Sequence, residues 1–444
     1  MYLLNAVIIC AFTVLGLVQF ATKSFWANCR NLWDMNATFV FGLAVLLNAP
    51  NAISMFLGGN VKVIDAFGNV QTVYAPSVRL LQGLSGIVVL GLAVMMLFIA
   101  LRGKKTLNGY VWPLLATCVV SLVSNLHSNL EFATLNQWTA LAVIAACLFA
   151  APSPGAALGA ALFGALYSVA TGILTFVNPD AAIEDCTRKC SPAGVILPGI
   201  NGSENAFGLC AVLAMPFVLL AFKSSARFIF SAFLAYLVLA SGSRSAVLGL
   251  VALAVLLFLF RLSKKGLSSF VAVAAAGVLV MFGVILPFMT KDPEAFSTRG
   301  RVWLTGIEYM SEAPVTGLGA SAWANLTQIG AIYRSDAYSL HNLWLDTLFV
   351  SGLIGFGLLL SSLIALIASH AQTTCFPQVF LILIVILTVG ILERSLSIYS
   401  SNWLGWVLPG LLLFRGGGAL SRNSQPFRAR ESYFVAGVRN LPGR

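Results

Sequence analysis

The residues best suited to acid–base chemistry lie in SLHNLWLDTLFVSGLIG, which begins at Ser339. His341 comes directly before a long apolar segment, so its ring is expected at a membrane interface. A neutral imidazole can accept a proton from a sugar hydroxyl, which makes His341 a candidate general base. Asn342 and Asp346 follow closely and could orient the ring or bind sugar hydroxyls. Taken alone, the stretch fits a capping or hydrogen-bonded interfacial histidine better.

A group of cationic side chains precedes this histidine in one polar segment. Its members are Lys291, Arg299, Arg301 and Arg334. Guanidinium groups bind phosphate oxygens in pairs and stay charged, so two or three could neutralise a diphosphate leaving group. The alternative to phosphate binding is that these residues belong to a solvated loop of mixed charge. Helical spacing places Arg299 on the stripe of Trp303, whereas Arg301 falls on the opposite face, where Glu308 or Glu312 would lie near it.

Arg244 in SGSRSAVLG is a further candidate phosphate ligand. It lies between the short apolar runs 228–241 and 245–261. Short flanking runs should bring its guanidinium near membrane depth, where an ionisable group suggests function. The alternative is an arginine at a helix end that extends its charge to the interface.

The polar segment 178–202 and the start of the next apolar span contain two groups of residues whose roles the sequence does not decide. In PGINGSENAFG, Asn201, Glu204 and Asn205 could bind sugar, but turn and capping roles explain them equally well. Cys186 and Cys190 share the polar loop, and they could form a disulfide if it faces an oxidising compartment.

Motifs for metal and nucleotide cofactors are missing from the sequence. There is no DxD, no Cys/His zinc spacing, no GxGxxG and no GxxxxGK[ST]. Two further histidines, His127 and His370, lie far from His341 in the sequence. We therefore expect no metal and no cofactor.

The composition requires a membrane environment for the elements that position these residues. Hydrophobic residues make up 59% of the chain and charged residues 9%, with a mean hydropathy of +0.91. A bilayer core needs roughly 20 residues of helix, and the long apolar runs lack the alternation of barrel strands. The sequence predicts an all-α polytopic protein with about 12 or 13 membrane helices. The predicted spans are 2–21, 36–58, 77–101, 110–130, 133–151, 156–177, 203–222, 228–241, 245–261, 267–288, 343–369, 376–392 and 397–414.

The predicted domains are a helix bundle over 1–288, a large polar and partly helical loop over 289–342, C-terminal helices over 343–414 and a basic tail over 415–444. Lys and Arg collect in short loops near 102–105, 223–227 and 261–265, and in the tail, which should all be cytoplasmic. The net charge of +11 is thereby explained without nucleic acid. Lys23 and Arg30 would place the first loop inside and the N-terminus outside, unless the first two spans are miscounted, so the side of the N-terminus stays open.

Three stretches in this order resemble the O-antigen ligase and polymerase superfamily. They are SGSRSAVLG, then R-x3-W-x10-P-x2-G-x-G from Arg299 to Gly319, then HN-x2-L with GLIG. PGINGSENAFG is similar to a fourth, upstream element. The resemblance implies a GT-C-type fold and a metal-independent, inverting transfer of glycan from undecaprenyl diphosphate at the periplasmic face of the bacterial inner membrane.

Carried over residue by residue, the resemblance implies that His341 is the general base and that Arg244 and Arg299 bind the donor diphosphate. Arg301 is the second candidate for a diphosphate ligand in that segment. Asn342, Asp346, Asn205 and Arg334 are candidate contacts to glycan or acceptor. Within the superfamily, one large outer loop looks more like a ligase, with lipid A-core as acceptor, than a polymerase or a protein O-oligosaccharyltransferase. We expect a monomer in contact with membrane lipids. A transporter or flippase for lipid-linked sugars is the alternative from another class, and it would not need His341.

Overall fold

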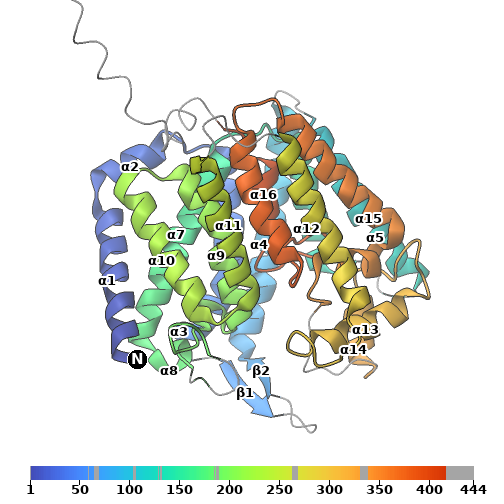
Figure 1. The fold of residues 1–444 in the computed structure, drawn as a ribbon, viewed down its shortest axis with the longest axis horizontal. Coiled ribbons are helices and arrows are strands. Elements are labelled where there is room, and N and C mark those ends of the chain that lie inside the picture. The colour runs from blue at the N-terminus through green and yellow to red at the C-terminus, as the bar shows by residue number, and fades with distance from the viewer. Residues whose placement is uncertain are drawn as a thin grey trace, which may run out of the picture.

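The computed structural model is a bundle of helices that run between two ends (Figure 1). It describes residues 2–58, 60–64, 70–103, 107–128, 130, 133–184, 186, 190–262, 269–330 and 339–416. The α-helices are α1 (Tyr2–Ala21), α2 (Lys23–Arg30), α3 (Met35–Phe56), α4 (Pro76–Arg102), α5 (Trp112–His127), α6 (Leu135–Phe149), α7 (Gly155–Val177), α8 (Pro179–Ala182), α9 (Glu204–Ala221), α10 (Ser224–Ser241), α11 (Arg244–Leu262), α12 (Ser269–Met289), α13 (Arg299–Met310), α14 (Ala322–Gln328), α15 (Leu343–His370), α16 (Phe376–Gly390) and α17 (Val407–Leu412). The 3-10 helices are η1 (Gly109–Val111) and η2 (Gly199–Asn201), and the strands are β1 (Asn60–Ile64) and β2 (Val70–Tyr74).

Ten of the described helical segments are long and apolar enough to cross a membrane. They contain α1, α3, α4, α5, α7, α9, α10, α11, α12 and α15. Two shorter apolar helices, α6 and α16, complete the bundle. The prediction of a polytopic helical membrane protein is confirmed. The core lies around α7 and α9, whose spans are the most buried, at 72% and 78%.

Contacts of α1 show which loops share an end of the bundle. Asn5 donates a hydrogen bond from Nδ2 to the carbonyl oxygen of Ala193, at 2.9 Å. At the other end of α1, Gln19 accepts one from Ser225, at 3.4 Å. One end of the bundle carries the N-terminus, strands β1 and β2, α8 and α13 (Figure 1). We call it the site end. The short helix α2 lies at the opposite end, so Lys23 and Arg30 share a side with Lys223.

One hairpin departs from the all-α prediction. Strands β1 and β2 pair antiparallel at the site end, with Asn60 opposite Tyr74 and Ile64 opposite Val70 (Figure 1). Alternating β-branched residues in NVKVI and VQTVY favour strands once the chain leaves the lipid. The pair is small and leaves the helical architecture unchanged.

Helix α15 is broken at Gly352, where φ is 61° and ψ is −164°. The loop 314–319 docks into this break through four backbone hydrogen bonds. Two N–H groups of the loop donate to helix carbonyls, Leu318 to Phe349 and Gly319 to Val350. Two N–H groups of the helix donate to loop carbonyls, Leu353 to Pro314 and Ile354 to Val315. All four distances lie between 2.8 and 3.1 Å. The loop thus replaces helical bonds that the break removes, as buried backbone in a membrane protein requires. The P-x2-G-x-G and GLIG motifs are therefore two halves of one contact.

The last predicted span, 397–414, is not a continuous helix. Helix α16 ends at Gly390, and the chain returns through an irregular, largely buried segment, 391–406, before the six-residue α17. Two neighbouring helices form hydrogen bonds with the backbone of this segment. Asn48 donates from Nδ2 to the carbonyl of Trp403 at 3.0 Å, and Ser401 N–H donates to the carbonyl of Asn136 at 2.9 Å. Serine and asparagine side chains that bond locally compete with a helix here, as Asn402 does with Ser397.

A first prediction concerns the break in α15. A Cβ atom at Gly352 would lie 2.3 Å from the carbonyl oxygen of Val315, and the positive φ disfavours a side chain as well. Gly352→Ala should therefore lower the free energy of unfolding by about 1–3 kcal/mol. Gly357, in the same helix, has no atom within 4 Å of its Cβ position. Gly357→Ala should leave the thermal unfolding midpoint in detergent unchanged or slightly raised, and equal midpoints for the two variants would refute this account.

Candidate functional site

Three charged or titratable side chains from distant segments meet at the site end. They are Arg299 at the start of α13, His341 before α15 and Glu393 after α16. Glu393 Oε2 lies 2.7 Å from His341 Nδ1, and Glu393 Oε1 pairs with Arg299 Nη2. The Glu393 side chain has no exposed surface, whereas Arg299 and His341 are 13% and 12% exposed. One buried carboxylate thus bridges the two residues expected to act on the substrate.

The backbone at His341 is held in an unusual conformation. Its φ of 47° lies in the left-handed region, which non-glycine residues rarely adopt. Hydrogen bonds fix the residues before it. Trp303 Nε1 donates to the carbonyl of Leu340 at 2.8 Å. The N–H of Leu340 donates to Asp346 Oδ1 at 3.4 Å, and the N–H of His341 donates to Ser339 Oγ at 3.3 Å. These contacts maintain a strained residue at the centre of the site, a frequent feature of functional positions.

Asn342 holds His341 against the bundle and has no exposed surface. Its Oδ1 caps α15 by accepting from Trp344 N–H at 3.0 Å and Leu345 N–H at 2.8 Å. Its Nδ2 donates to the carbonyls of Gly283 at 2.9 Å and Ile391 at 2.7 Å. These four bonds occupy both hydrogens of the amide nitrogen and both lone pairs of the amide oxygen. The position of Asn342 supports an anchoring role, between α12, α15 and the segment of Glu393.

The two arginines of α13 have different surroundings, as their helical spacing predicted. Arg299 points toward the bundle with the buried Trp303 one turn later. Arg301 forms an ion pair with Glu294 at the surface, where the two side chains are 49% and 63% exposed. Such a pair contributes little stability and lies apart from the Glu393 carboxylate. The candidate diphosphate ligand of α13 that belongs to the cluster is Arg299.

A second ion pair adjoins the cluster. Asp346 Oδ2 lies 3.8 Å from Arg394 Nη1, and Arg394 directly follows Glu393 in the chain. Asp346 also accepts the N–H of Leu340, so it supports the residues that carry His341. It is 3% exposed, which leaves it little surface for the predicted glycan contact. The pair Asp346–Arg394 links the start of α15 to the irregular segment 391–406.

Arg244 begins α11 at the same end of the bundle and is exposed. Farther along α11, Gly249 packs against Val389 of α16, which places the start of α11 near the level of Glu393. Among the described residues Arg244 forms no ion pair with the cluster. It therefore offers a separate positive charge at the site end.

A disulfide loop supports the turn before Arg244. The structure joins Cys186 to Cys190, and the chain then packs on this turn. Leu197 N–H donates to the carbonyl of Ala240 at 3.0 Å, and Ser191 lies against Gly242, whose φ is 73°. The loop of Cys186 and Cys190 and the SGSRS motif are thus parts of one local structure.

The other predicted site residues lie away from the cluster or cannot be placed. Asn205 is half-buried in the first turn of α9, and Arg334 lies outside the described residues. Asn201 is buried and bonded to Tyr167 and to Asn48, so it has a structural role. His127 is exposed at the end of α5.

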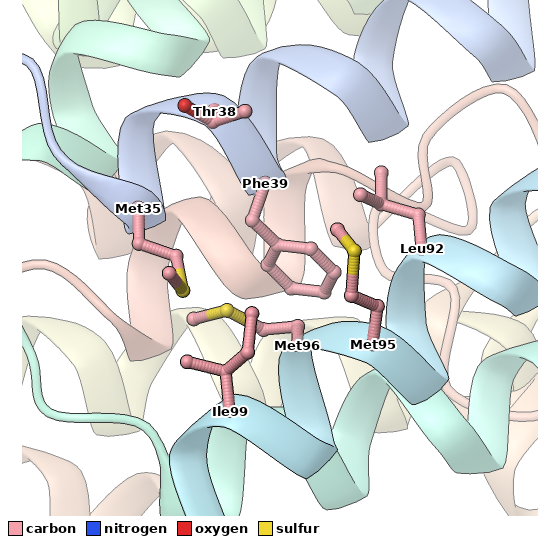
Figure 2. A pocket seen from close by; sticks show the side chains of 7 residues that line it. All are labelled: Met35, Thr38, Phe39, Leu92, Met95, Met96 and Ile99. Atoms are coloured by element: carbon pink, nitrogen blue, oxygen red, sulfur yellow. The ribbon is translucent and has the colours of Figure 1, made fainter. Parts of the chain in front are cut away.

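His370 is buried at the opposite end of the bundle, where its Nδ1 lies 2.9 Å from Ser369 Oγ. A small pocket at that end, between α3 and α4, is also separate from the site (Figure 2). Apart from Thr38 its lining is apolar, as the labelled side chains in Figure 2 show. It is lined by Met35, Thr38, Phe39, Leu92, Met95, Met96 and Ile99.

The sequence interpretation missed Glu393 and Arg394. Their signal was the dipeptide Glu-Arg at the end of the apolar run of α16, in a chain with only 9% charged residues. Adjacent opposite charges beside a membrane helix are expensive unless each finds a partner. Those partners, His341, Arg299 and Asp346, are distant in sequence, so only the fold reveals the pairing.

The geometry defines what the cluster can do chemically. A carboxylate 2.7 Å from Nδ1 favours the imidazole tautomer with its hydrogen on Nδ1, which places the lone pair on Nε2. That nitrogen can then accept a proton, and Glu393 would stabilise the resulting imidazolium. The described part of the chain contains no group of three or more His, Cys, Asp or Glu side chains that could hold a metal ion.

Part of the chain matches a known protein family. Residues 229–360 match the family model described as O-antigen ligase, and they form a domain of that family. The matched range contains Arg244, Arg299 and His341 but ends before Glu393. No curated protein matches the chain.

A second prediction tests the anchoring role of Asn342. Asn342→Asp keeps the size and the capping oxygen, but it turns a second oxygen toward the carbonyls of Gly283 and Ile391. Two buried hydrogen bonds are lost, so the free energy of unfolding should fall by about 2–3 kcal/mol. Asn205→Asp, at a half-buried helix start, is the matched control and should leave thermal unfolding nearly unchanged. Similar unfolding midpoints for both variants would contradict the role.

Proposed function

We propose that the protein is an O-antigen ligase, which transfers O-antigen glycan from undecaprenyl diphosphate to lipid A-core oligosaccharide. The observation that carries the proposal is the Arg299–Glu393–His341 cluster, because it brings a histidine that could act as a base close to an arginine that could bind phosphate, at one end of a membrane bundle. The O-antigen ligase family domain at 229–360 includes two of these three residues. Both substrates carry lipid, which fits a site at the end of membrane helices.

In the proposed reaction, His341 Nε2 accepts the proton of an acceptor sugar hydroxyl. The oxygen attacks the anomeric carbon of the donor sugar as the bond from that carbon to the diphosphate oxygen breaks. The bonding electrons leave with undecaprenyl diphosphate, and the proton on His341 passes to the leaving phosphate or to water. Attack opposite the leaving group inverts the anomeric carbon. Glu393 stabilises the imidazolium during this step.

Arginine would supply the electrostatic part of catalysis. Arg299 is almost buried, so its charge is screened less than that of a surface arginine. Arg244 adds an exposed charge at the same end. Two guanidinium groups can neutralise developing charge on the diphosphate without a metal ion.

The distribution of charges and cysteines supports a site in the periplasm of a bacterial inner-membrane protein. Lys23 and Lys223 lie at the opposite end, which the positive-inside rule assigns to the cytoplasm. The disulfide of Cys186 and Cys190 lies toward the site end, and disulfides persist in oxidising compartments. The proposed donor carries its glycan on that same side.

A lipid-linked sugar transporter is the second candidate, and one observation favours it. Helix α15 is interrupted at Gly352 and the return through 391–406 is irregular, and discontinuous membrane helices are typical of transporters. Both interruptions are filled by protein contacts, however, and a transporter has no need of a base. The effect of His341→Ala on chemistry therefore separates the two candidates.

The third prediction is that purified protein transfers glycan from undecaprenyl diphosphate to lipid A-core in the presence of EDTA. His341→Ala should lower kcat by about 10²–10⁴-fold, since general base catalysis contributes that much. His370→Ala, which removes a histidine at the opposite end, is the control and should retain activity if it folds.

Each outcome of this assay is informative. A longer lipid-linked glycan without transfer to lipid A-core would identify a polymerase, and transfer to a protein acceptor would identify an oligosaccharyltransferase. Absence of any new glycosidic bond with active substrates would reject the enzyme and favour the transporter.

The fourth prediction compares the two arginines of α13. Arg299→Lys keeps the charge but loses the guanidinium geometry that pairs with Glu393 and would bind phosphate. We expect kcat/KM for the donor to fall about ten- to hundredfold. Arg301→Lys changes a surface pair in the same helix and should leave kcat/KM within about twofold. Equal effects of the two substitutions would reject the assignment of Arg299.

A further inference from the structure

We propose that Glu393 is a positioning residue that makes activation of His341 depend on the donor. In this view the donor diphosphate draws Arg299 away from Glu393, which leaves the carboxylate to act on His341 alone. The inference rests on the proposed function, because it requires a donor that carries a diphosphate. It adds a coupling between substrate binding and the strength of the base.

The first support is how the carboxylate is shared. Each oxygen of Glu393 has a different partner, with Oε1 on Arg299 and Oε2 on His341. Glu393 itself has no exposed surface, whereas both partners retain some. A ligand can therefore reach Arg299 and His341 but not the carboxylate that joins them. A bound diphosphate therefore acts on Glu393 through its two partners, and Arg299 is the one whose charge attracts the diphosphate.

The second support is the charge balance around the site. Two cationic side chains, Arg299 and Arg394, face two anionic ones, Glu393 and Asp346. A diphosphate entering this balanced cluster gains most if Arg299 turns toward it, because the guanidinium can exchange one oxyanion for another. Asp346 and Arg394 remain paired to each other, so they do not replace Arg299 beside Glu393.

The consequence for His341 follows from simple electrostatics. While Arg299 neutralises Glu393, the carboxylate attracts a proton on the imidazole only weakly. Once Arg299 is engaged by the diphosphate, the negative charge of Glu393 acts on His341 with less compensation and favours the protonated ring. The base thus becomes stronger when a donor is present, and acceptor hydroxyls alone meet a weaker base.

The test is Glu393→Gln, which preserves the shape of the side chain and removes its charge. Arg299 is then no longer held by an anion, so undecaprenyl diphosphate should bind about fivefold tighter or more. The imidazolium loses its stabilising carboxylate, so kcat for transfer should fall about a hundredfold or more. Tighter binding with slower turnover is a split that a purely structural role would not produce.

Glu294→Gln is the matched control, because Glu294 pairs with the exposed Arg301 in the same region. It should change neither the Kd for undecaprenyl diphosphate nor kcat. If Glu393→Gln does not fold, Glu393→Asp takes its place, since the shorter carboxylate keeps its charge but cannot reach both partners. The same split is then expected, with smaller changes.

Weaker binding of undecaprenyl diphosphate by the folded Glu393 variant, or an unchanged kcat, would overturn the coupling. Such a result leaves the proposed function intact if wild-type protein binds undecaprenyl diphosphate and transfers glycan. Failure of the wild type itself to bind and transfer would instead reject the proposed function. The two failures are therefore distinguishable within one set of measurements.

Discussion

The site end of the bundle depends on one buried carboxylate. Glu393 has no contact with solvent, and a charge in that position is tolerated only when oppositely charged or donor groups touch it. Its partners come from two other segments, Arg299 in α13 and His341 before α15. Loss of either partner would leave a buried charge poorly compensated, so the ion pairs determine where α13 packs as well as how the imidazole is oriented. The requirement for electrostatic balance thus fixes the geometry on which the chemistry would depend.

Irregular backbone is the means by which these side chains meet. A continuous helix through 391–406 would have to give up the contacts that Trp403 and Ser401 make with neighbouring helices. The break at Gly352 likewise admits the loop 314–319, which follows α13 and so helps to hold Arg299 in place. Unpaired backbone groups are costly in a membrane protein. At each interruption, backbone or side-chain amide groups of another segment therefore supply hydrogen-bond partners. The side-chain amide of Asn342 likewise bonds to α12 and to the segment that carries Glu393.

The sequence predicted the helical bundle well, because spans of apolar residues reflect bilayer thickness directly. It also separated Arg299 from Arg301, because helical spacing alone places them on different faces. It failed where pairing over long distances decides the outcome. The run 397–414 is apolar enough for a helix, yet Asn402 bonds locally to Ser397 and the backbone of Ser401 bonds to Asn136 of another helix. The anchoring contacts of the buried Asn342 were not predicted either, because Gly283 and Ile391 are distant in sequence. Glu393 could not be assigned because its partners lie 94 and 52 residues away.

In the proposed mechanism, the two phosphate-binding arginines need not act at the same stage. Arg244 is exposed and unpaired with the cluster, so its charge reaches further into solvent and is suited to first contact with an anionic headgroup. Arg299 is compensated by Glu393 in the free protein, so it attracts the donor only at short range, where exchange of oxyanions becomes favourable. A neutral resting cluster also avoids an uncompensated charge at the membrane boundary when no substrate is bound. The same ion pair that stabilises the empty site would therefore have to open before the reaction could begin.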